Sequence, residues 1–136
     1  ATRTESKMKK LLPAITALAA ALSSHANAQS CDTSSEQQVG VIEIVQFRLA
    51  EGVSDADFKA AAASTMPFLC GTDGFIRRTL SRGDDGLWID HVEWADVNIA
   101  QAAAAAAMEN ETMLPFMMAI DPASISLNYQ SPLALE

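Results

Sequence analysis

The chain has 136 residues, of which 49% are hydrophobic, and a formal net charge of −8. This length leaves room for one domain of ordinary size. Residues 29–136 carry sixteen acidic and five basic side chains, a net charge of −11. Such an acidic surface repels phosphate backbones and anionic lipid, so the composition argues against binding to nucleic acid or to a membrane surface.

Residues 1–28 have the pattern of an export signal with a few residues upstream of it. A short basic start at 8–10 precedes an apolar run at 11–22, which is too short to span a bilayer. A small-x-small cleavage pattern follows at 26–28. This order predicts cleavage before Gln29 and a periplasmic or secreted protein that no longer contacts the membrane. A buried N-terminal helix is the alternative interpretation.

The rest of the chain divides into a polar lead-in at 29–38, a domain at 39–130 and a C-terminal tail at 131–136. Residues 39–49 are rich in β-branched side chains, which predicts the first strand. Ser54 is a good N-cap for a helix over about 55–69, which carries Pro67 in its last turn and stops at Gly71.

The second half of the domain contains a predicted hairpin and a second helical region. Strands are expected at 75–82 and 87–94, joined by the turn sequence GDDG. Asp96 caps a helix through the alanine run that follows, and 112–120 reads as a further short helical segment. Residues 124–129 alternate as a fourth strand.

The element order β-α-β-β-α-β predicts a ferredoxin-like α+β fold, an antiparallel sheet with both helical regions on one face. The uncovered face must be solvated or buried by a second copy of the chain. In this topology Cys31 and Cys70 lie at the same end of the domain, so a disulfide between them is geometrically possible. An even number of cysteines in an exported chain favours a disulfide between them. Two free thiols are the alternative.

Three stretches carry a resemblance to a known family: VIEIVQFRLAEG, GFIRRTLSRGDDGLWIDHVEWAD and the helix that begins after Trp94. Over 39–129 the chain resembles the antibiotic-biosynthesis-monooxygenase-like proteins, which are dimeric α+β barrels. The resemblance implies a homodimer packed sheet against sheet, a small pocket for an apolar or aromatic ligand, and a cofactor-independent oxygenase acting on a phenol or quinol. Trp94 matches a Trp that lines the pocket in some members. The Asn that the oxygenases carry on the first strand has no match, and Gln46 is the nearest polar residue.

The stretch WIDHVEW, residues 88–94, supplies the candidate site residues. Neighbours on a strand point to opposite faces, so Trp88, Asp90 and Trp94 share one face and His91 lies on the other. We expect Asp90 to act as a base toward a phenolic proton, between pocket walls formed by Trp88 and Trp94. A hydrogen bond from Asp90 to a neighbouring strand or subunit is the alternative.

His91 is a second candidate catalytic residue, and Arg78 a candidate for substrate binding. If the turn centres on its two aspartates, Arg78 lies opposite His91 and Thr79 lies opposite Asp90. Arg78 would then complete a polar network with His91 and Glu93.

No metal or other cofactor is predicted. His91 and Glu93 lack a third ligand on their face, and residues 29–136 contain no second His. The methionines at 113, 117 and 118 are interpreted as adaptable packing rather than a copper site. The sequence leaves two main functional hypotheses: a cofactor-free oxygenase on a small aromatic, or a non-catalytic protein that binds a small ligand in the same pocket. A haem binder is a weaker third.

Overall fold

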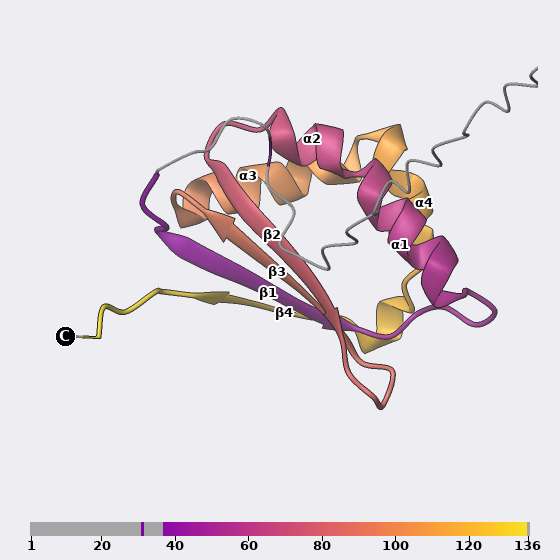
Figure 1. Ribbon diagram of the computed structural model, residues 1–136. Coiled ribbons are helices and arrows are strands. Elements are labelled where there is room, and N and C mark those ends of the chain that lie inside the picture. The colour runs from indigo at the N-terminus through magenta and orange to yellow at the C-terminus, as the bar shows by residue number, and fades with distance from the viewer. Residues whose placement is uncertain (1–30, 32–36, 136) are drawn as a thin grey trace, which may run out of the picture.

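The computed structural model of the protein describes residue 31 and residues 37–135. The predicted export signal and most of the lead-in lie outside the described residues. Four strands form one antiparallel sheet in the order β2-β3-β1-β4 (Figure 1). They are β1 (Val41–Phe47), β2 (Phe75–Arg82), β3 (Trp88–Trp94) and β4 (Ser126–Gln130). The predicted ferredoxin-like α+β fold is confirmed.

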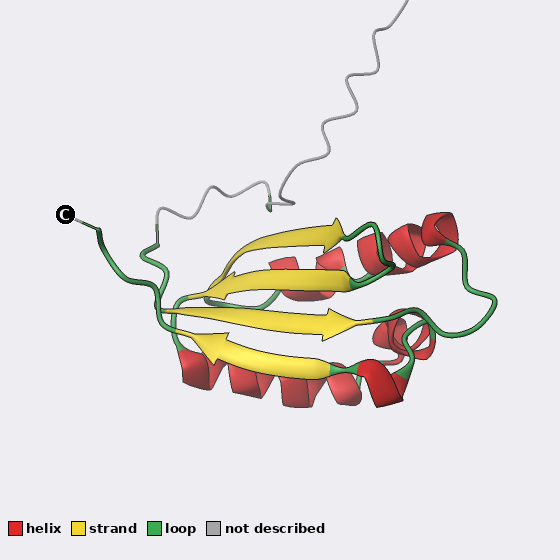
Figure 2. Cartoon of the chain, turned by 90° about the horizontal axis from the view of Figure 1, so that it is seen from below, coloured by secondary structure: helices red, strands yellow, loops and turns green. Residues whose placement is uncertain are grey.

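The helices cover a single face of this sheet, and Figure 2 views the sheet from its uncovered side, with the helices behind it. They are α1 (Asp55–Ser64), α2 (Met66–Cys70), α3 (Val97–Met108) and α4 (Leu114–Met118), with short 3₁₀ turns at η1 (Glu111–Met113) and η2 (Pro122–Ser124). Both predicted N-caps form: the Ser54 side chain accepts from the Asp57 N–H, and the Asp96 side chain accepts from the Ile99 N–H.

The single helix predicted over 55–69 is wrong, because the chain breaks it into α1 and α2 at Thr65. Pro67 has no N–H with which to continue the α1 ladder, and it occupies the first turn of α2, where that N–H is not needed. The backbone N–H and the hydroxyl of Thr65 both donate to the Ala62 carbonyl and tighten the joint. Leu69 of α2 is buried and packs in the core beneath the helices.

The predicted register of the β2–β3 hairpin is wrong by one residue. Arg78 lies opposite Val92, Thr79 opposite His91, and Leu80 opposite Asp90. The loop closes on a Gly83 N–H to Leu87 carbonyl bond and so contains an odd number of residues, with Gly86 at a φ of 81°. A shift of one residue exchanges the faces, and it moves Arg78 to the same face as Asp90.

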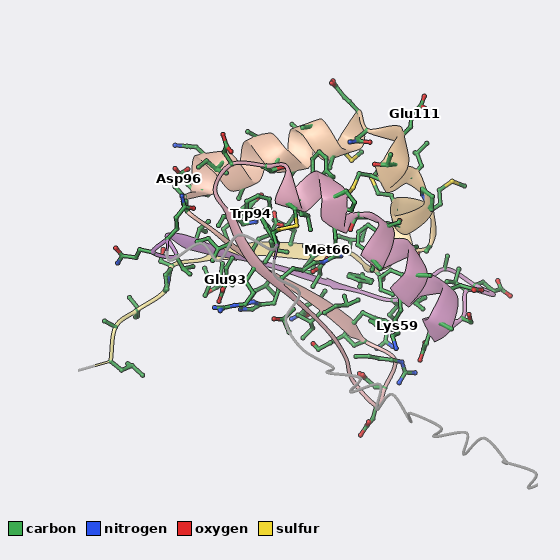
Figure 3. The ribbon with its side chains drawn as sticks, turned by 45° about the horizontal axis from the view of Figure 1, so that its top comes forward. Lys59, Met66, Glu93, Trp94, Asp96 and Glu111 are labelled. Atoms are coloured by element: carbon green, nitrogen blue, oxygen red, sulfur yellow. A yellow bond between two sulfur atoms is a disulfide. The ribbon has the colours of Figure 1, made fainter. Side chains whose placement is uncertain are left out.

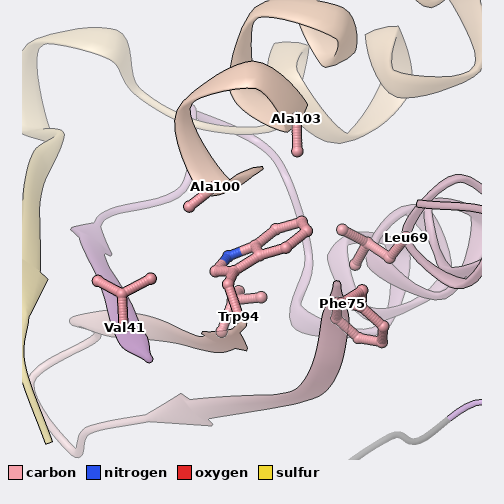
Figure 4. Close-up of a cluster of buried hydrophobic side chains, with 7 residues drawn as sticks. Val41, Leu69, Phe75, Trp94, Ala100 and Ala103 are labelled. Carbon is pink, nitrogen blue, oxygen red and sulfur yellow. The ribbon is translucent and has the colours of Figure 1, made fainter. Parts of the chain in front are cut away.

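The core between the sheet and the helices consists of two clusters. The first surrounds the indole of Trp94, which is 2% exposed, as Figure 4 shows. Its other members are Val41, Leu69, Phe75, Val92, Ala100 and Ala103. The second cluster is aromatic and lies toward α1 and α4; it contains Phe47, Phe58, Trp88, Ala119 and Ile120. The space between these clusters is not filled completely by side chains.

A disulfide joins Cys31 to Cys70, whose Cα atoms lie 5.6 Å apart. It ties the segment that precedes β1 to the last residue of α2, and Cys31 packs against the first core cluster. Closing a loop between residues 39 apart in sequence restricts the unfolded chain and so stabilises the fold. Within 37–135, no helix is long and apolar enough to cross a membrane.

Candidate functional site

A cavity of about 140 Å³ lies between the two core clusters, bounded by the sheet on one side and by the helices on the other. Its wall is mostly apolar; Glu43, Thr65, Arg78 and Asp90 contribute polar side chains to it, and Trp94 contributes an indole N–H. The apolar lining includes Val45, Phe47, Phe68, Leu69, Val92, Trp94, Ala103, Ala104, Ala107, Met113, Phe116 and Ile120. Apolar concave sites with a few converging polar groups are the usual form of small-molecule pockets.

Arg78 and Asp90 form a buried ion pair at the floor of this cavity, with exposures of 4% and 6%. The guanidinium donates from Nε to Oδ1 at 2.8 Å and from Nη2 to Oδ2 at 2.6 Å, a bidentate geometry. Its Nη1 also donates to the Thr65 hydroxyl and to the Ala62 carbonyl at the end of α1. The network therefore joins β2 and β3 to the α1–α2 joint, and both oxygens of Asp90 are occupied by it.

Phe116 of α4 completes the surroundings of Arg78. The guanidinium carbon lies 5.1 Å from the centroid of this ring, within the range of a cation–π interaction. The positive charge of Arg78 is thus matched by a carboxylate on one side and by an aromatic face on another. We refer to Arg78, Asp90, Thr65 and the Ala62 carbonyl as the arginine clamp.

Glu43 is the other carboxyl group in the cavity, and its surroundings differ from those of Asp90. It lies in the middle of β1, is 9% exposed, and has Tyr129 of β4 directly opposite. Burial raises the pKa of Glu43 above its ordinary value of 4.5, and the negative charge of Asp90 raises it further. The Tyr129 hydroxyl, the Trp94 indole and the charge of Arg78 each lower the pKa and offset part of that rise.

The buried indole Nε1 of Trp94 makes no direct hydrogen bond within the described part of the chain. Its interaction with Glu43 is therefore weaker than a bond of ordinary geometry. The Tyr129 hydroxyl interacts with the same carboxyl, and the pKa of Tyr129 is raised by burial and by the charge of Glu43. Glu43 thus has a phenol on one side and the cavity on another.

Three of the five predicted site residues line the cavity: Asp90, Trp94 and Arg78. Trp88 does not; it packs edge-on against Phe58 in the second core cluster, with ring centroids 4.8 Å apart. His91 points from the opposite, uncovered face of the sheet, so it cannot reach a ligand in this cavity.

The expected network of Arg78 with His91 and Glu93 does not form. Glu93 forms an ion pair with Arg77 rather than with Arg78. The hairpin register places Arg77 opposite Glu93, and both lie on the uncovered face of the sheet. Figure 3 shows Trp94 pointing between sheet and helices and Glu93, one residue earlier, pointing away from them. Among the described residues, no three His, Cys, Asp or Glu side chains gather closely enough to hold a metal ion.

The sequence reasoning missed Glu43 as a site residue. The signal for it was present, since Glu43 is the one charged residue in the inward series Val41, Glu43, Val45 and Phe47 of the first strand. A carboxylate in an otherwise apolar series is costly to bury unless something in the fold uses it. Tyr129 could not be paired with it from sequence, because the register of β4 against β1 is set by tertiary contacts.

Comparison with solved structures identifies the class of fold. A candidate antibiotic biosynthesis monooxygenase from Bordetella bronchiseptica matches with a TM-score of 0.61 and 18% identity, over 71% of this chain and 100% of its own. SnoaB, a cofactor-independent oxygenase from Streptomyces nogalater, matches at 0.51 and 23%, over 73% and 96%. The monooxygenase ActVA-Orf6 of Streptomyces coelicolor, solved with nanaomycin D, matches at 0.54 and 12%, over 72% and 91%.

No protein family matches the sequence, and neither does any curated protein. The similarity to solved structures is therefore a similarity of fold. The chain has the ferredoxin-like fold of antibiotic-biosynthesis-monooxygenase-like proteins, as the sequence predicted.

Proposed function

We propose that the protein is a monooxygenase-like enzyme that oxidises a small aromatic hydroxyl compound, a phenol or quinol, with dioxygen and without a bound cofactor. The observation that carries this proposal is the apolar cavity between sheet and helices, with a buried carboxyl group at its wall. The occurrence of this fold in cofactor-independent oxygenases supports the same reaction class.

The chemistry requires only a substrate that can be ionised beside oxygen in a dry site. Loss of the hydroxyl proton makes the ring electron-rich enough to react with dioxygen. One oxygen atom of dioxygen then enters the ring, and the other leaves as water with the two hydrogens that the substrate loses. A phenol plus dioxygen thus gives a quinone plus water, and all the electrons come from the substrate. The protein's part is to orient the ring, to accept the proton and to exclude bulk water.

Oxygen uptake by the purified protein, with a panel of phenols and quinols and a metal chelator present, tests this function. Ala107 and Ala105 lie on the same helix, but Ala107 lines the cavity and Ala105 is exposed. Ala107→Leu should abolish uptake by filling the space for the ring, whereas Ala105→Leu should leave it unchanged. Both changes keep helix propensity nearly constant. Absence of uptake with every compound would refute an oxygenase on this substrate class.

A non-catalytic ligand-binding protein is the second candidate. It is favoured by the arginine clamp, which occupies both oxygens of Asp90, the residue that the sequence suggested as base. In that case small aromatics raise the melting temperature, and Ala107→Leu removes the rise, while no oxygen is consumed.

The proposal includes a homodimer in which two copies cover each other's bare sheet face. Ile42, Ile44 and Ile89 are half-buried side chains on the central strands of that face, with His91 among them. Apolar side chains on an open sheet face are a reason for association. Light scattering at micromolar concentration should give twice the chain mass, and Ile44→Arg should give monomers. A monomeric parent protein would remove the dimer from the proposal.

Export to the periplasm or the exterior is also part of this proposal. The Cys31–Cys70 disulfide supports it, because such bonds persist in oxidising compartments. Cell fractionation, with the mass of the mature chain measured, tests both the compartment and cleavage before Gln29.

A further inference from the structure

Glu43 and Asp90 lie in one cavity, but only one of them has a complete set of strong partners. The clamp gives Asp90 two short charge-assisted bonds from Arg78. Glu43 has a phenolic hydroxyl and a weakly placed indole N–H, and its pKa is raised by burial. A buried carboxylate left this way can still accept a strong hydrogen bond, because the donors of Arg78 and Thr65 in the cavity wall are already bonded to Asp90, to each other and to the Ala62 carbonyl.

The cavity restricts the ligand that could supply this donor. A cavity of about 140 Å³ is close in size to the roughly 150 Å³ engineered cavities that hold a benzene molecule, so one six-membered ring fits. With Arg78 neutralised by Asp90, the remaining charge in the cavity is that of Glu43, which repels anions. These features favour a neutral ligand that places one ring in the cavity and can donate a hydrogen bond.

Tyr129 lies directly opposite Glu43 on β4, and its hydroxyl lowers the pKa of Glu43. Because that interaction lowers the pKa of Glu43, it keeps more of the carboxyl ionised and ready to accept a second donor.

We propose that Glu43 is the ligand-recognition residue of this site: its carboxylate accepts the hydroxyl hydrogen of a neutral single-ring phenol or enol, and Tyr129 tunes it for that role. This assignment deepens the proposed function. The recognition of the hydroxyl stands without an oxygenase reaction, whereas the proton transfer to Glu43 rests on the proposed function. In that step the substrate O–H bond breaks, its electron pair stays on the substrate oxygen, and a new O–H bond forms on Glu43. The product pair is a phenolate and a neutral carboxylic acid, with no net redox change.

Ligand affinity tests the assignment without any turnover. Phenol, its methyl ether anisole and benzoate have the same ring but differ in donor and charge. Phenol is still neutral at about pH 8. Calorimetry at this pH should give phenol an affinity about tenfold or more above that of anisole, because a hydrogen bond to a charged group contributes about that factor. Benzoate should not bind. Glu43→Gln should reduce the phenol preference to a few-fold or less, whereas Glu51→Gln, a change at an exposed glutamate, should keep it.

The pH dependence separates a recognition role from a structural one. The phenol preference of the parent protein should be complete above the raised pKa of Glu43 and should fall as the pH drops through that pKa. Tyr129→Phe removes an interaction that lowers this pKa, so the midpoint of the fall should move to higher pH. Equal affinity for phenol and anisole, or a preference that ignores both Glu43→Gln and pH, would overturn the assignment.

Failure of the proposed function gives a different result from failure of this assignment. If the phenol preference depends on Glu43 but no oxygen is consumed, the recognition role stands and the oxygenase falls. If oxygen is consumed equally by the parent protein and by Glu43→Gln, the oxygenase stands and the assignment falls.

Discussion

The arginine clamp and Glu43 lie in the same buried layer, yet they show opposite ways of burying charge. The clamp closes on itself: Arg78 bonds both oxygens of Asp90, the Thr65 hydroxyl and a helix-end carbonyl. Glu43 is held by a tyrosine hydroxyl and an indole without a close bond, and its pKa is raised by burial. Buried polar groups with complete partners hold a fold together, whereas a buried group with incomplete partners is a candidate for ligand binding.

Breaking the clamp should have the largest effect on stability. Arg78→Met leaves Asp90 buried without its partner, so the free energy of unfolding should fall by about 3–5 kcal/mol. Denaturant unfolding followed by circular dichroism measures it. The double change Arg78→Met with Asp90→Leu should recover most of the loss, because it removes both charges. A loss below about 1 kcal/mol for the single change would show that the clamp is not a structural element.

Removing the disulfide should have the next largest effect. Changing both Cys31 and Cys70 to Ser frees the unfolded chain and should lower the free energy of unfolding by about 2–4 kcal/mol. Because the bond ends at α2, which contributes Phe68 and Leu69 to the cavity, phenol affinity should fall as well. Unfolding curves with and without reductant check the first effect, and parent protein in reductant should match the double variant.

Glu43→Gln should act in the opposite direction to Arg78→Met and stabilise the protein at neutral pH. The pKa of Glu43 is higher in the folded state than its ordinary value of 4.5. As the pH rises from about 4.5 through the raised pKa, the folded protein must ionise a buried carboxyl group, and the free energy of unfolding falls. The gain from Gln is therefore complete above that value and vanishes near and below pH 4.5. A rise in melting temperature at neutral pH, which disappears near pH 4.5, is expected. Loss of stability at neutral pH would mean that Glu43 is a structural partner like Asp90.

Arg77→Met should have the smallest effect and provides the matched control for Arg78→Met. The two arginines are adjacent, but Arg77 faces the uncovered side, is about half exposed and pairs with Glu93. Water reaches the Arg77 end of this pair, although the Glu93 side chain is only 13% exposed, so the loss of unfolding free energy should be clearly smaller than for Arg78→Met. A similar loss for both arginines would remove the contrast between the two faces.

Most of the fold could be predicted from the sequence, because strand periodicity, the caps at Ser54 and Asp96 and the GDDG turn are local signals. The length of the turn was the point of failure. Counting from the two aspartates placed Arg78 on the face of His91, and the αL glycine at Gly86 reversed this. One residue in a loop therefore decided whether Arg78 belonged to the surface or to the cavity.

The site was predicted in part, for a related reason. Alternation along β3 placed Asp90 and Trp94 correctly on one face, and separated His91 from them. Alternation gives the face but not the position along it, so Trp88 was assigned to the pocket although it lies in the second core cluster. Glu43 was overlooked although it interrupts an apolar inward series, and its neighbours Tyr129 and Trp94, which come from two other strands, could not be assigned to it from the sequence.

The most direct test of the account is an NMR titration of the Glu43 side-chain carboxyl carbon, with and without phenol. The account predicts a pKa above the ordinary 4.5 in the free protein and a lower pKa when phenol is bound, because a hydrogen-bond donor favours the charged form. Anisole should leave the titration unchanged. A Glu43 that titrates like an exposed glutamate, or that responds equally to phenol and anisole, would contradict the account.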